Sequence, residues 1–238
     1  MNNADRGKLV GMVLGDGHLS FRKRFKKDVK GQPKYEYLTS ALVIAHSIKQ
    51  KDYLEHKRNV IHSVIGGKMP DIAVYDHTLP SNGKTYRLAR FQKTSTYFRI
   101  LHGFIYSNRG KKYITKQVLD MLTPEGIAYW YMDDGSVHRN RNKDDKVTSC
   151  NTEIATYCTK QEVDNICEYF EKKYNIVFKP AYDKARDKYF VRTNTAGSKK
   201  FVELVKPYIV PCMKYKIQHV ADLTVHEHQA PLAGDDIV

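Results

Sequence analysis

An apolar segment that ends in Asp-Gly occurs twice in this chain, and it constrains the fold more than any other feature. It reads Leu9-Val-Gly-Met-Val-Leu-Gly-Asp16-Gly17 near the start and Ile127-Ala-Tyr-Trp-Tyr-Met-Asp-Asp134-Gly135 past the middle. The apolar residues are too continuous for a half-exposed helix or strand, so each segment is expected to be buried on most sides. Because glycine favours the left-handed end of a helix, Gly17 and Gly135 are expected to stop two buried helices.

The segments that follow the two motifs also match in order. A basic segment comes first, at residues 22–27 and again at 139–143, and a strand-like stretch follows, at 35–46 and 147–158. Next comes an amphipathic helix, marked by Tyr53 and Ile61 in the first half and by Val163, Ile166 and Phe170 in the second. The matching order predicts that one structural unit is repeated.

The rest of each unit continues the match. Strand candidates pair at 71–77 with 85–92, joined by the turn signal Asn82-Gly83, and at 176–182 with 188–194. A further helix follows, at 97–105 and around 201–208, and each unit closes in a lysine-tyrosine cluster. The chain is therefore predicted to be an α+β protein, a pseudo-twofold tandem repeat of αββαββα units.

Boundaries follow from the repeat. The expected N-terminal subdomain spans 1–115, a linker with a short helix spans 116–123, and the C-terminal subdomain spans 124–225 with Pro124 at the start of its first helix. Residues 226–238 lack periodicity and are expected to form a peripheral tail.

Charge points to a polyanionic partner. The 238 residues contain 40 Lys plus Arg against 26 Asp plus Glu, a formal net charge of +14. A merely soluble basic protein is the plain alternative, but nucleic acid is the leading partner class. No apolar run reaches the length of a membrane span and the start lacks a signal peptide, so a cytoplasmic or organellar place, such as the mitochondrial matrix, is expected, without secretion or a membrane partner. The ends, Met1 and Val238, lack the terminal residues of a complete intein.

The two motifs resemble the signature of the LAGLIDADG homing endonuclease family, in its single-chain, two-motif branch. The second half resembles the omega-intron members of that branch through Leu122-Thr-Pro, the motif from Ala128 to Gly135, and Pro207-Tyr-Ile-Val-Pro211. The resemblance implies that the motif helices pack at the interface between the halves, with small residues Gly11, Gly15 and Ala128 allowing close contact. It also implies two antiparallel β-sheets that form a DNA-binding saddle. The implied activity is cleavage of both strands of a long, partly asymmetric DNA site by a monomer, leaving short 3′ overhangs.

The resemblance also implies the active-site residues. Asp16 and Asp134 would be the catalytic metal ligands, with the backbone carbonyls of Gly15 and Asp133 assisting. We assign the side-chain role to Asp134 and not to its neighbour because Asp134 aligns with Asp16. Mg²⁺ prefers oxygen ligands and is the expected cofactor; Mn²⁺ is expected to substitute, and Ca²⁺ to bind without supporting cleavage.

Basic side chains supply the other predicted roles. Lys112 and Lys216 match the family's lysines near the attacking water, although lysines at a helix end also complement the helix dipole. The basic segments after the motifs favour DNA contact over merely solvated loops, and strand residues farther along would reach bases. The residues expected to contact DNA are Arg22, Lys23, Arg24, Lys26, Lys27, Arg87, Arg90, Arg139, Arg141, Lys143, Arg186, Lys188 and Arg192.

The same pattern has other interpretations. A single Asp-Gly after a helix is usually only a helix end, but its duplication in matching context favours function. An intron RNA maturase on the same fold is the main alternative activity, and intron RNA the alternative partner; paired carboxylates favour the nuclease because an RNA binder does not need them. A DNA-binding regulator would carry an added helix-turn-helix domain, for which the chain has no room.

Overall fold

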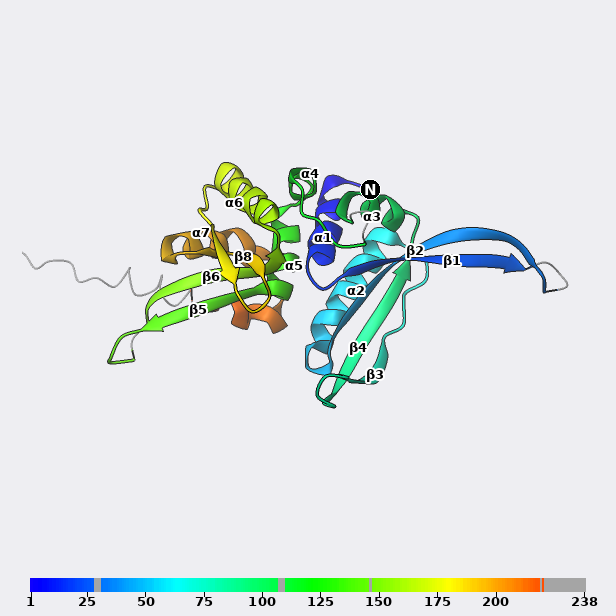
Figure 1. Ribbon diagram of the computed structural model, residues 1–238, viewed down its shortest axis with the longest axis horizontal. Helices are drawn as coiled ribbons and strands as arrows, with labels where there is room; N and C mark the ends of the chain where they lie inside the picture. The colour runs from blue at the N-terminus through cyan, green and yellow to red at the C-terminus, as the bar shows by residue number, and fades with distance from the viewer. Residues whose placement is uncertain (28–30, 107–109, 146, 219, 221–238) are drawn as a thin grey trace, which may run out of the picture. The chain divides into compact units, whose positions relative to one another are not determined.

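A computed structural model describes residues 1–27, 31–106, 110–145, 147–218 and 220 (Figure 1). The expected tail at 226–238 lies outside these residues. The chain forms two compact units, Met1–Asp134 with Val210–Met213, and Gly135–Ile209 with Lys214–Val238. The boundaries expected at 115 and 124 follow the sequence repeat, whereas the compact units follow the packing of the chain. As a result, the second motif helix, at 124–134, belongs to the first compact unit.

The first repeat follows the predicted order of elements. Its first half contains helix α1 (Asn3–Leu14), strands β1 (His18–Lys27) and β2 (Pro33–Ser47), a 3-10 turn η1 (Ile48–Gln50) and helix α2 (Lys51–Ile65). Strands β3 (Ala73–Thr78) and β4 (Thr85–Thr94) and helix α3 (Tyr97–Ile105) complete it, and the short helix α4 (Lys116–Asp120) lies in the expected linker. Gly83 has a φ of +65° in the turn between β3 and β4, which confirms the turn that Asn82-Gly83 predicts.

The second repeat restates the order. It contains α5 (Pro124–Asp134), β5 (Gly135–Arg141), β6 (Val147–Cys158), α6 (Lys160–Tyr174), β7 (Lys179–Asp183), β8 (Lys188–Thr193), α7 (Thr195–Val205), and the 3-10 turns η2 (Lys206–Tyr208) and η3 (Pro211–Lys216). All strands pair antiparallel, in the orders β1-β2-β4-β3 and β5-β6-β8-β7. The same strand order twice confirms the α+β tandem repeat.

The basic segments after the motifs lie largely on strands. Residues 22–27 belong to β1, which pairs with β2, and Arg139 and Arg141 belong to β5, which pairs with β6. Lysine and arginine have little intrinsic preference for strands. These segments form strands because they pair with β2 and β6. Most of these basic residues therefore lie on a strand that is paired with its neighbour in each unit.

Helices cover one face of each sheet. In the first unit α2 and α3 contact β2, and in the second unit α6 contacts β7 and β8 while α7 contacts β6. The second core is aromatic: the ring centroids of Phe170 and Phe178 lie 4.8 Å apart, and Phe201 lies 5.8 Å and 5.6 Å from them. Helix α6 begins with a capping box between Thr159 and Glu162, which satisfies its first amides. Burial alternates along the strands: in β4 Ala89 and Phe91 are buried while Arg90 and Gln92 are partly exposed, and in β8 Val191 and Thr193 are buried while Arg192 is exposed. One face of each sheet is therefore more open than the other.

Glycines set the close contact between α1 and α5. A Cβ on Gly11 would overlap the carbonyl of Gly126, and one on Gly126 would overlap the carbonyl of Gly7. Gly7 and Gly11 lie four residues apart and so form one ridge of α1, and Gly15 caps the end of this helix. The predicted small residue Gly11 is confirmed at this contact, whereas Gly7 and Gly126 were not predicted. Tyr129 and Trp130, the bulky residues of the second motif, are buried, with 2% and 0% exposure.

The expectation that Gly17 and Gly135 end helices in a left-handed conformation is wrong. Neither has a positive φ, and Gly135 begins β5. The amide of Gly17 donates to the Met12 carbonyl at 2.8 Å, and a Cβ on Gly17 would press on that carbonyl. Glycine is needed there for a close approach between backbone segments.

None of the helices in the described part of the chain is both long and apolar enough to cross a membrane.

Candidate active site

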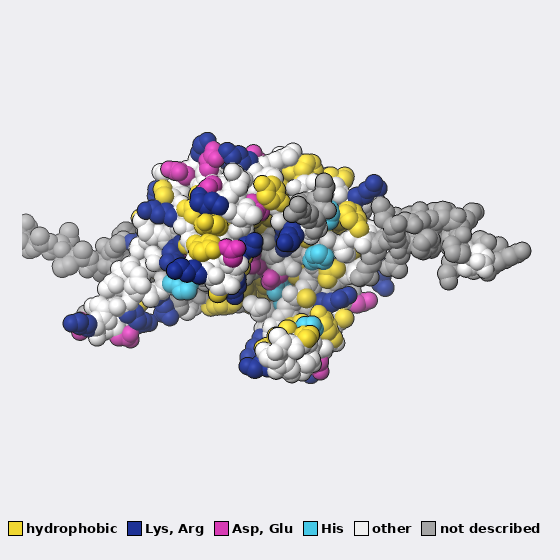
Figure 2. Space-filling view, in the orientation of Figure 1, with side chains coloured by type: hydrophobic (Ala, Val, Ile, Leu, Met, Phe, Trp, Pro, Cys, Tyr) yellow, Lys and Arg dark blue, Asp and Glu magenta, His cyan; other side chains and the backbone are white. Residues whose placement is uncertain are grey.

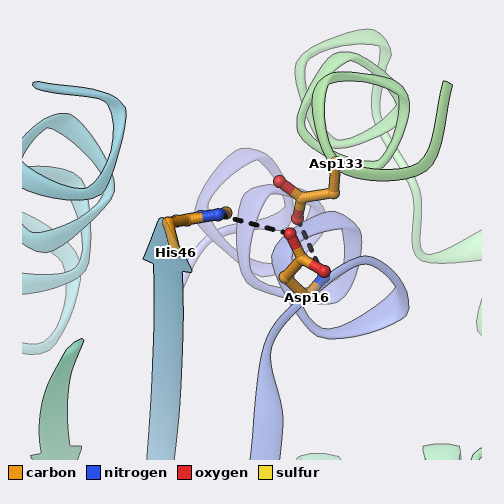
Figure 3. A group of neighbouring side chains, drawn as sticks. All are labelled: Asp16, His46 and Asp133. Carbon is orange, nitrogen blue, oxygen red and sulfur yellow. Dashed lines mark hydrogen bonds and ion pairs between the residues drawn. The ribbon is translucent and has the colours of Figure 1, made fainter. Parts of the chain in front are cut away.

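Asp16 lies where α1 ends and the chain turns into β1. Its side chain is 44% exposed, so the carboxylate is open to solvent on one side. Its backbone amide donates a hydrogen bond to Asp133 Oδ2 at 3.0 Å (Figure 3). Because Asp133 belongs to the last turn of α5, this bond joins the ends of the two motif helices within the first unit.

Asp133 is held in a buried ion pair. Lys57, on α2, donates to Asp133 Oδ1 at 2.5 Å and to Oδ2 at 2.7 Å, and both side chains are 0% exposed. A Cβ on Gly15 would overlap the Asp133 carboxylate, so glycine at that position lets the two helix ends meet. Burial, and then the charge of Asp133, raise the pKa of the neighbouring Tyr53 well above its ordinary value.

His46, at the end of β2, completes a cluster of possible metal ligands. Its Nδ1 lies 3.3 Å from Asp16 Oδ2, and its side chain is 3% exposed. One ligand atom from each of Asp16, His46 and Asp133 lies within 4.8 Å of the others (Figure 3). Each of these residues already has a partner in the cluster, so it is first of all a hydrogen-bonded network.

Lys112 lies against the first motif. Its Nζ donates to the Gly15 carbonyl at 2.5 Å. Burial lowers the pKa of this ammonium group, while the charges of Asp134, Asp16 and Asp133 act in the opposite direction. The lysine therefore lies among the acidic residues where the motif helices end.

Lys216 occupies the corresponding place in the second unit. Its Nζ donates to the Gly135 carbonyl at 2.8 Å. Each lysine thus binds a backbone carbonyl next to its motif aspartate. The carbonyl bound by Lys112 belongs to Gly15, one residue before Asp16, whereas the carbonyl bound by Lys216 belongs to Gly135, one residue after Asp134. The second half is a divergent copy of the first at this point.

The donor set suits a hard divalent cation. Asp16 offers an exposed carboxylate, and Asp134, at the end of α5, is only partly buried. Mg²⁺ is typically held by one or two carboxylates together with waters and substrate phosphate. The Asp133 carboxylate is buried and paired with Lys57, whereas the Asp16 carboxylate is partly exposed. The roles of Asp134 and of the Gly15 and Asp133 carbonyls stay predictions.

Strand alternation sorts the predicted DNA contacts of the first unit. Arg90 pairs with Ala45, on the face opposite to the buried Ala89 and Phe91. Arg87 has the same parity as Ala89 and thus belongs to the helix-covered face, at an exposed end of β4. The predicted contacts Arg22, Lys23, Arg24, Lys26 and Lys27 belong to β1, but their side chains lie outside the described structure.

The second unit divides in the same way. Lys188 and Arg192 alternate with the buried Val191 and Thr193, so they project from the face that the helices leave open. Arg192 Nε donates to Glu153, a neighbour on that face.

Four further predicted contacts of this unit lie in other settings. Arg139 pairs with the buried Cys150 on the helix side, and Arg141 donates to the Asp145 carbonyl at 2.7 Å. Arg186, in the turn between β7 and β8, pairs with Asp183 at 2.6 Å and lies over the Tyr157 ring. Lys143 is exposed in the turn after β5. In Figure 2 the Lys and Arg side chains are spread over the surface of both units.

Sequence reasoning missed His46 and Lys57. A signal for the lysine was present: Tyr53, Lys57 and Ile61 lie four residues apart, on the face by which α2 is buried. A charged residue at helical spacing within an apolar stripe indicates a buried partner. The partners, in β2 and α5, come from distant parts of the chain and left no pattern near Lys57.

Comparison with known proteins identifies the family. The sequence model of the LAGLIDADG DNA endonuclease family matches residues 6–201. The chain belongs to this family. The LAGLIDADG chain is similar to the homing endonuclease I-WcaI, solved bound to its DNA recognition sequence: the TM-score is 0.69 at 24% identity, with 91% of this chain and 86% of that chain covered. This likeness shows a shared fold.

Curated relatives differ in length. DNA endonuclease I-ChuI of Chlamydomonas applanata is 25% identical over 88% of this chain and 92% of its own length. Protein RecA of Mycolicibacterium chitae is 26% identical over 88% of this chain, but the match spans only 45% of that protein. Cytochrome b mRNA maturase bI2 of Debaryomyces hansenii is 33% identical over 58% of this chain and 50% of its own length. The chain thus spans about half the length of the first relatives it matches.

Proposed function

We propose that this chain is a site-specific homing endonuclease that hydrolyses one phosphodiester on each strand of a long, partly asymmetric DNA site. One observation carries the proposal: two Asp-ended motif helices pack together, and Asp16, Asp133 and the ammonium group of Lys112 gather where they end. Family membership and the similarity to I-ChuI support it. The expected products have short 3′ overhangs, and the expected active form is a monomer inside a cell or organelle.

The aspartates and the lysines of the site have different proposed roles. Asp16 and Asp134 would hold Mg²⁺, which supplies a bound, more acidic water and stabilises charge on the phosphate oxygens. Lys112 and Lys216 would stabilise the charge that builds on the phosphate in the transition state, because an ammonium group in a partly buried site interacts strongly with such charge. Mn²⁺ is expected to replace Mg²⁺, whereas Ca²⁺, with its longer bonds and looser geometry, is expected to bind without supporting cleavage.

The open faces of the sheets are the proposed DNA-binding surfaces. Arg90 in the first unit and Lys188 and Arg192 in the second project from these faces. Lysines and arginines that contact phosphates supply affinity, and those that reach base edges supply specificity. Strands β1 and β5 continue the same two sheets, and we propose that their basic residues add contacts to DNA.

Cleavage of a randomised duplex DNA library tests the proposal. The purified chain with Mg²⁺ should cut a small set of related sequences on both strands, and the products should map to one long site. Chelation of the metal with EDTA should abolish cutting. If no sequence is cut with Mg²⁺ or Mn²⁺, the nuclease proposal is rejected.

An intron RNA maturase is the second candidate, favoured by the 33% identity to cytochrome b mRNA maturase bI2. Under this alternative the chain would bind a structured intron RNA more tightly than any duplex in the library. Competition between the two nucleic acids at the same salt concentration separates the two functions.

A further inference from the structure

Lys57 has a buried ammonium group that contacts two acceptor groups. Its Nζ donates to both Asp133 oxygens, at 2.5 and 2.7 Å, and contacts His46 Nε2 at 3.2 Å. An ammonium group has three N–H donors and no acceptor. The Asp133 carboxylate and His46 Nε2 are therefore both acceptors for the ammonium group of a side chain that is 0% exposed.

This geometry determines which nitrogen of His46 carries the proton. Because Lys57 can only donate, His46 Nε2 must accept, and a neutral imidazole then carries its proton on Nδ1. Nδ1 is the nitrogen that lies 3.3 Å from Asp16 Oδ2. The ring thus donates to the Asp16 carboxylate and has no lone pair on that side for a metal ion.

Asp133 forms a second connection from Lys57 to the same residue. Its Oδ2 accepts from Lys57 and from the backbone amide of Asp16, at 3.0 Å. Asp16 is therefore held twice, at its amide through Asp133 and at its carboxylate through His46. The outer part of the carboxylate stays exposed.

A purely structural role for Lys57 is the simpler alternative, and the repeat argues against it. The buried residues Tyr53, Leu54, Lys57 and Ile61 of α2 match Glu162, Val163, Ile166 and Phe170 of α6 in spacing. The position of Lys57 is thus occupied by a fully buried isoleucine in the second unit. A buried ion pair is often no more stabilising than well-packed apolar residues. Packing alone does not account for the lysine.

We propose that Lys57 is a positioning residue that fixes the His46 ring and the Asp133 carboxylate and, through both, holds Asp16 in place to bind the metal. The catalytic consequence rests on the proposed endonuclease function. The hydrogen-bond arrangement does not, and it can be tested on the free protein.

Nitrogen NMR of the histidine rings tests the arrangement directly. The full ¹⁵N-labelled chain is measured without metal at mildly alkaline pH, and His46 is assigned by the loss of its signals in His46→Gln. The expected spectrum shows a protonated Nδ1 and an unprotonated Nε2, and Lys57→Met should shift the ring toward the Nε2-protonated form. A wild-type ring protonated on Nε2, or on both nitrogens, would overturn the proposal. It would also be overturned by a ring that is unchanged in folded Lys57→Met.

A double variant separates positioning from stability. Lys57→Met alone leaves the Asp133 charge buried without its cation and should unfold at lower urea concentration than wild type, whereas Lys57→Met with Asp133→Leu should recover stability. On the mapped DNA site the double variant should still show kcat lowered by about 10- to 100-fold, the usual effect of losing a partner of a metal ligand. Recovery of kcat together with stability would show that Lys57 is only structural. If wild type does not cut DNA at all, the proposed function fails while the NMR result stands by itself.

Discussion

At the residue scale, the acidic residues of the second motif have different environments. The side chain of Asp133 is fully buried and paired with Lys57, whereas Asp134 has the largest effect of the nearby carboxylates on the pKa of Lys112. The first motif has glycine at the position of Asp133, and that glycine leaves room for the Asp133 carboxylate. Two neighbouring aspartates can therefore serve different purposes, one in holding the site together and one in binding the metal.

Replacing Lys112 tests the proposed lysine role. Lys112→Met should lower kcat by about 10²- to 10³-fold, the usual loss when one donor to a developing negative charge is removed. Lys111→Met, at the exposed neighbouring lysine, is the matched control and should cut at nearly the wild-type rate. Single-turnover cleavage of the mapped site measures both. Equal rates for the two variants would remove Lys112 from the catalytic mechanism.

At the scale of elements, the packing of α1 against α5 depends on glycine. Gly11→Ala would place a methyl group on the Gly126 carbonyl, so the helices would have to separate. Overpacking of this kind typically costs about 1–3 kcal/mol. The midpoint of urea unfolding should fall accordingly.

Gly103→Ala is the matched control for this helix contact. Gly103 lies in α3, and a Cβ there would meet nothing within 4 Å. This substitution should leave the midpoint unchanged or raise it, because alanine favours a helix by about 1 kcal/mol over glycine. If both variants unfold like wild type, the close approach of α1 and α5 is not what stabilises the first unit.

Local patterns predicted most of the elements. The expected strand at 147–158 matches β6, and Asn82-Gly83 forms the turn between β3 and β4. The basic strands β1 and β5 were less visible, because lysine and arginine carry little strand preference and pairing with β2 and β6 decides their structure.

The candidate site was predictable only where the motifs or the closing lysine clusters contain it. Asp16 stood out through the repeated motif, whereas the convergence of the two motif helices and the role of Lys112 were implied by the family resemblance. His46 and Lys57 were not predicted, since their roles depend on contacts between β2, α2 and α5, which are distant in the sequence. Long-range polar pairs leave no periodic signal, and only the buried position of Lys57 on α2 hinted at one.

At the scale of the whole molecule, the net charge of +14 predicts salt-sensitive DNA binding. A protein that makes several phosphate contacts releases counterions from DNA, and its affinity falls by about 10³- to 10⁵-fold between about 50 and 200 mM salt. Fluorescence anisotropy of the labelled target site without metal measures this slope. A flat response would contradict binding through phosphates.

Two arginines of β4 test which face of the first sheet binds the duplex. Arg90 projects from the open face of the first sheet, whereas Arg87 belongs to the helix-covered side. Arg90→Gln should therefore weaken binding, and Arg87→Gln should change it little. Equal losses from both would show that the open face alone does not bind the duplex.

The central claim, that the motif aspartates form a shared metal-dependent centre, is tested most directly by Asp16→Asn and Asp134→Asn on the mapped site. Each substitution keeps the side chain's shape but removes its charge, so binding in Ca²⁺ should stay near the wild-type level while double-strand cleavage in Mg²⁺ disappears. Efficient double-strand cleavage by either variant would contradict the account.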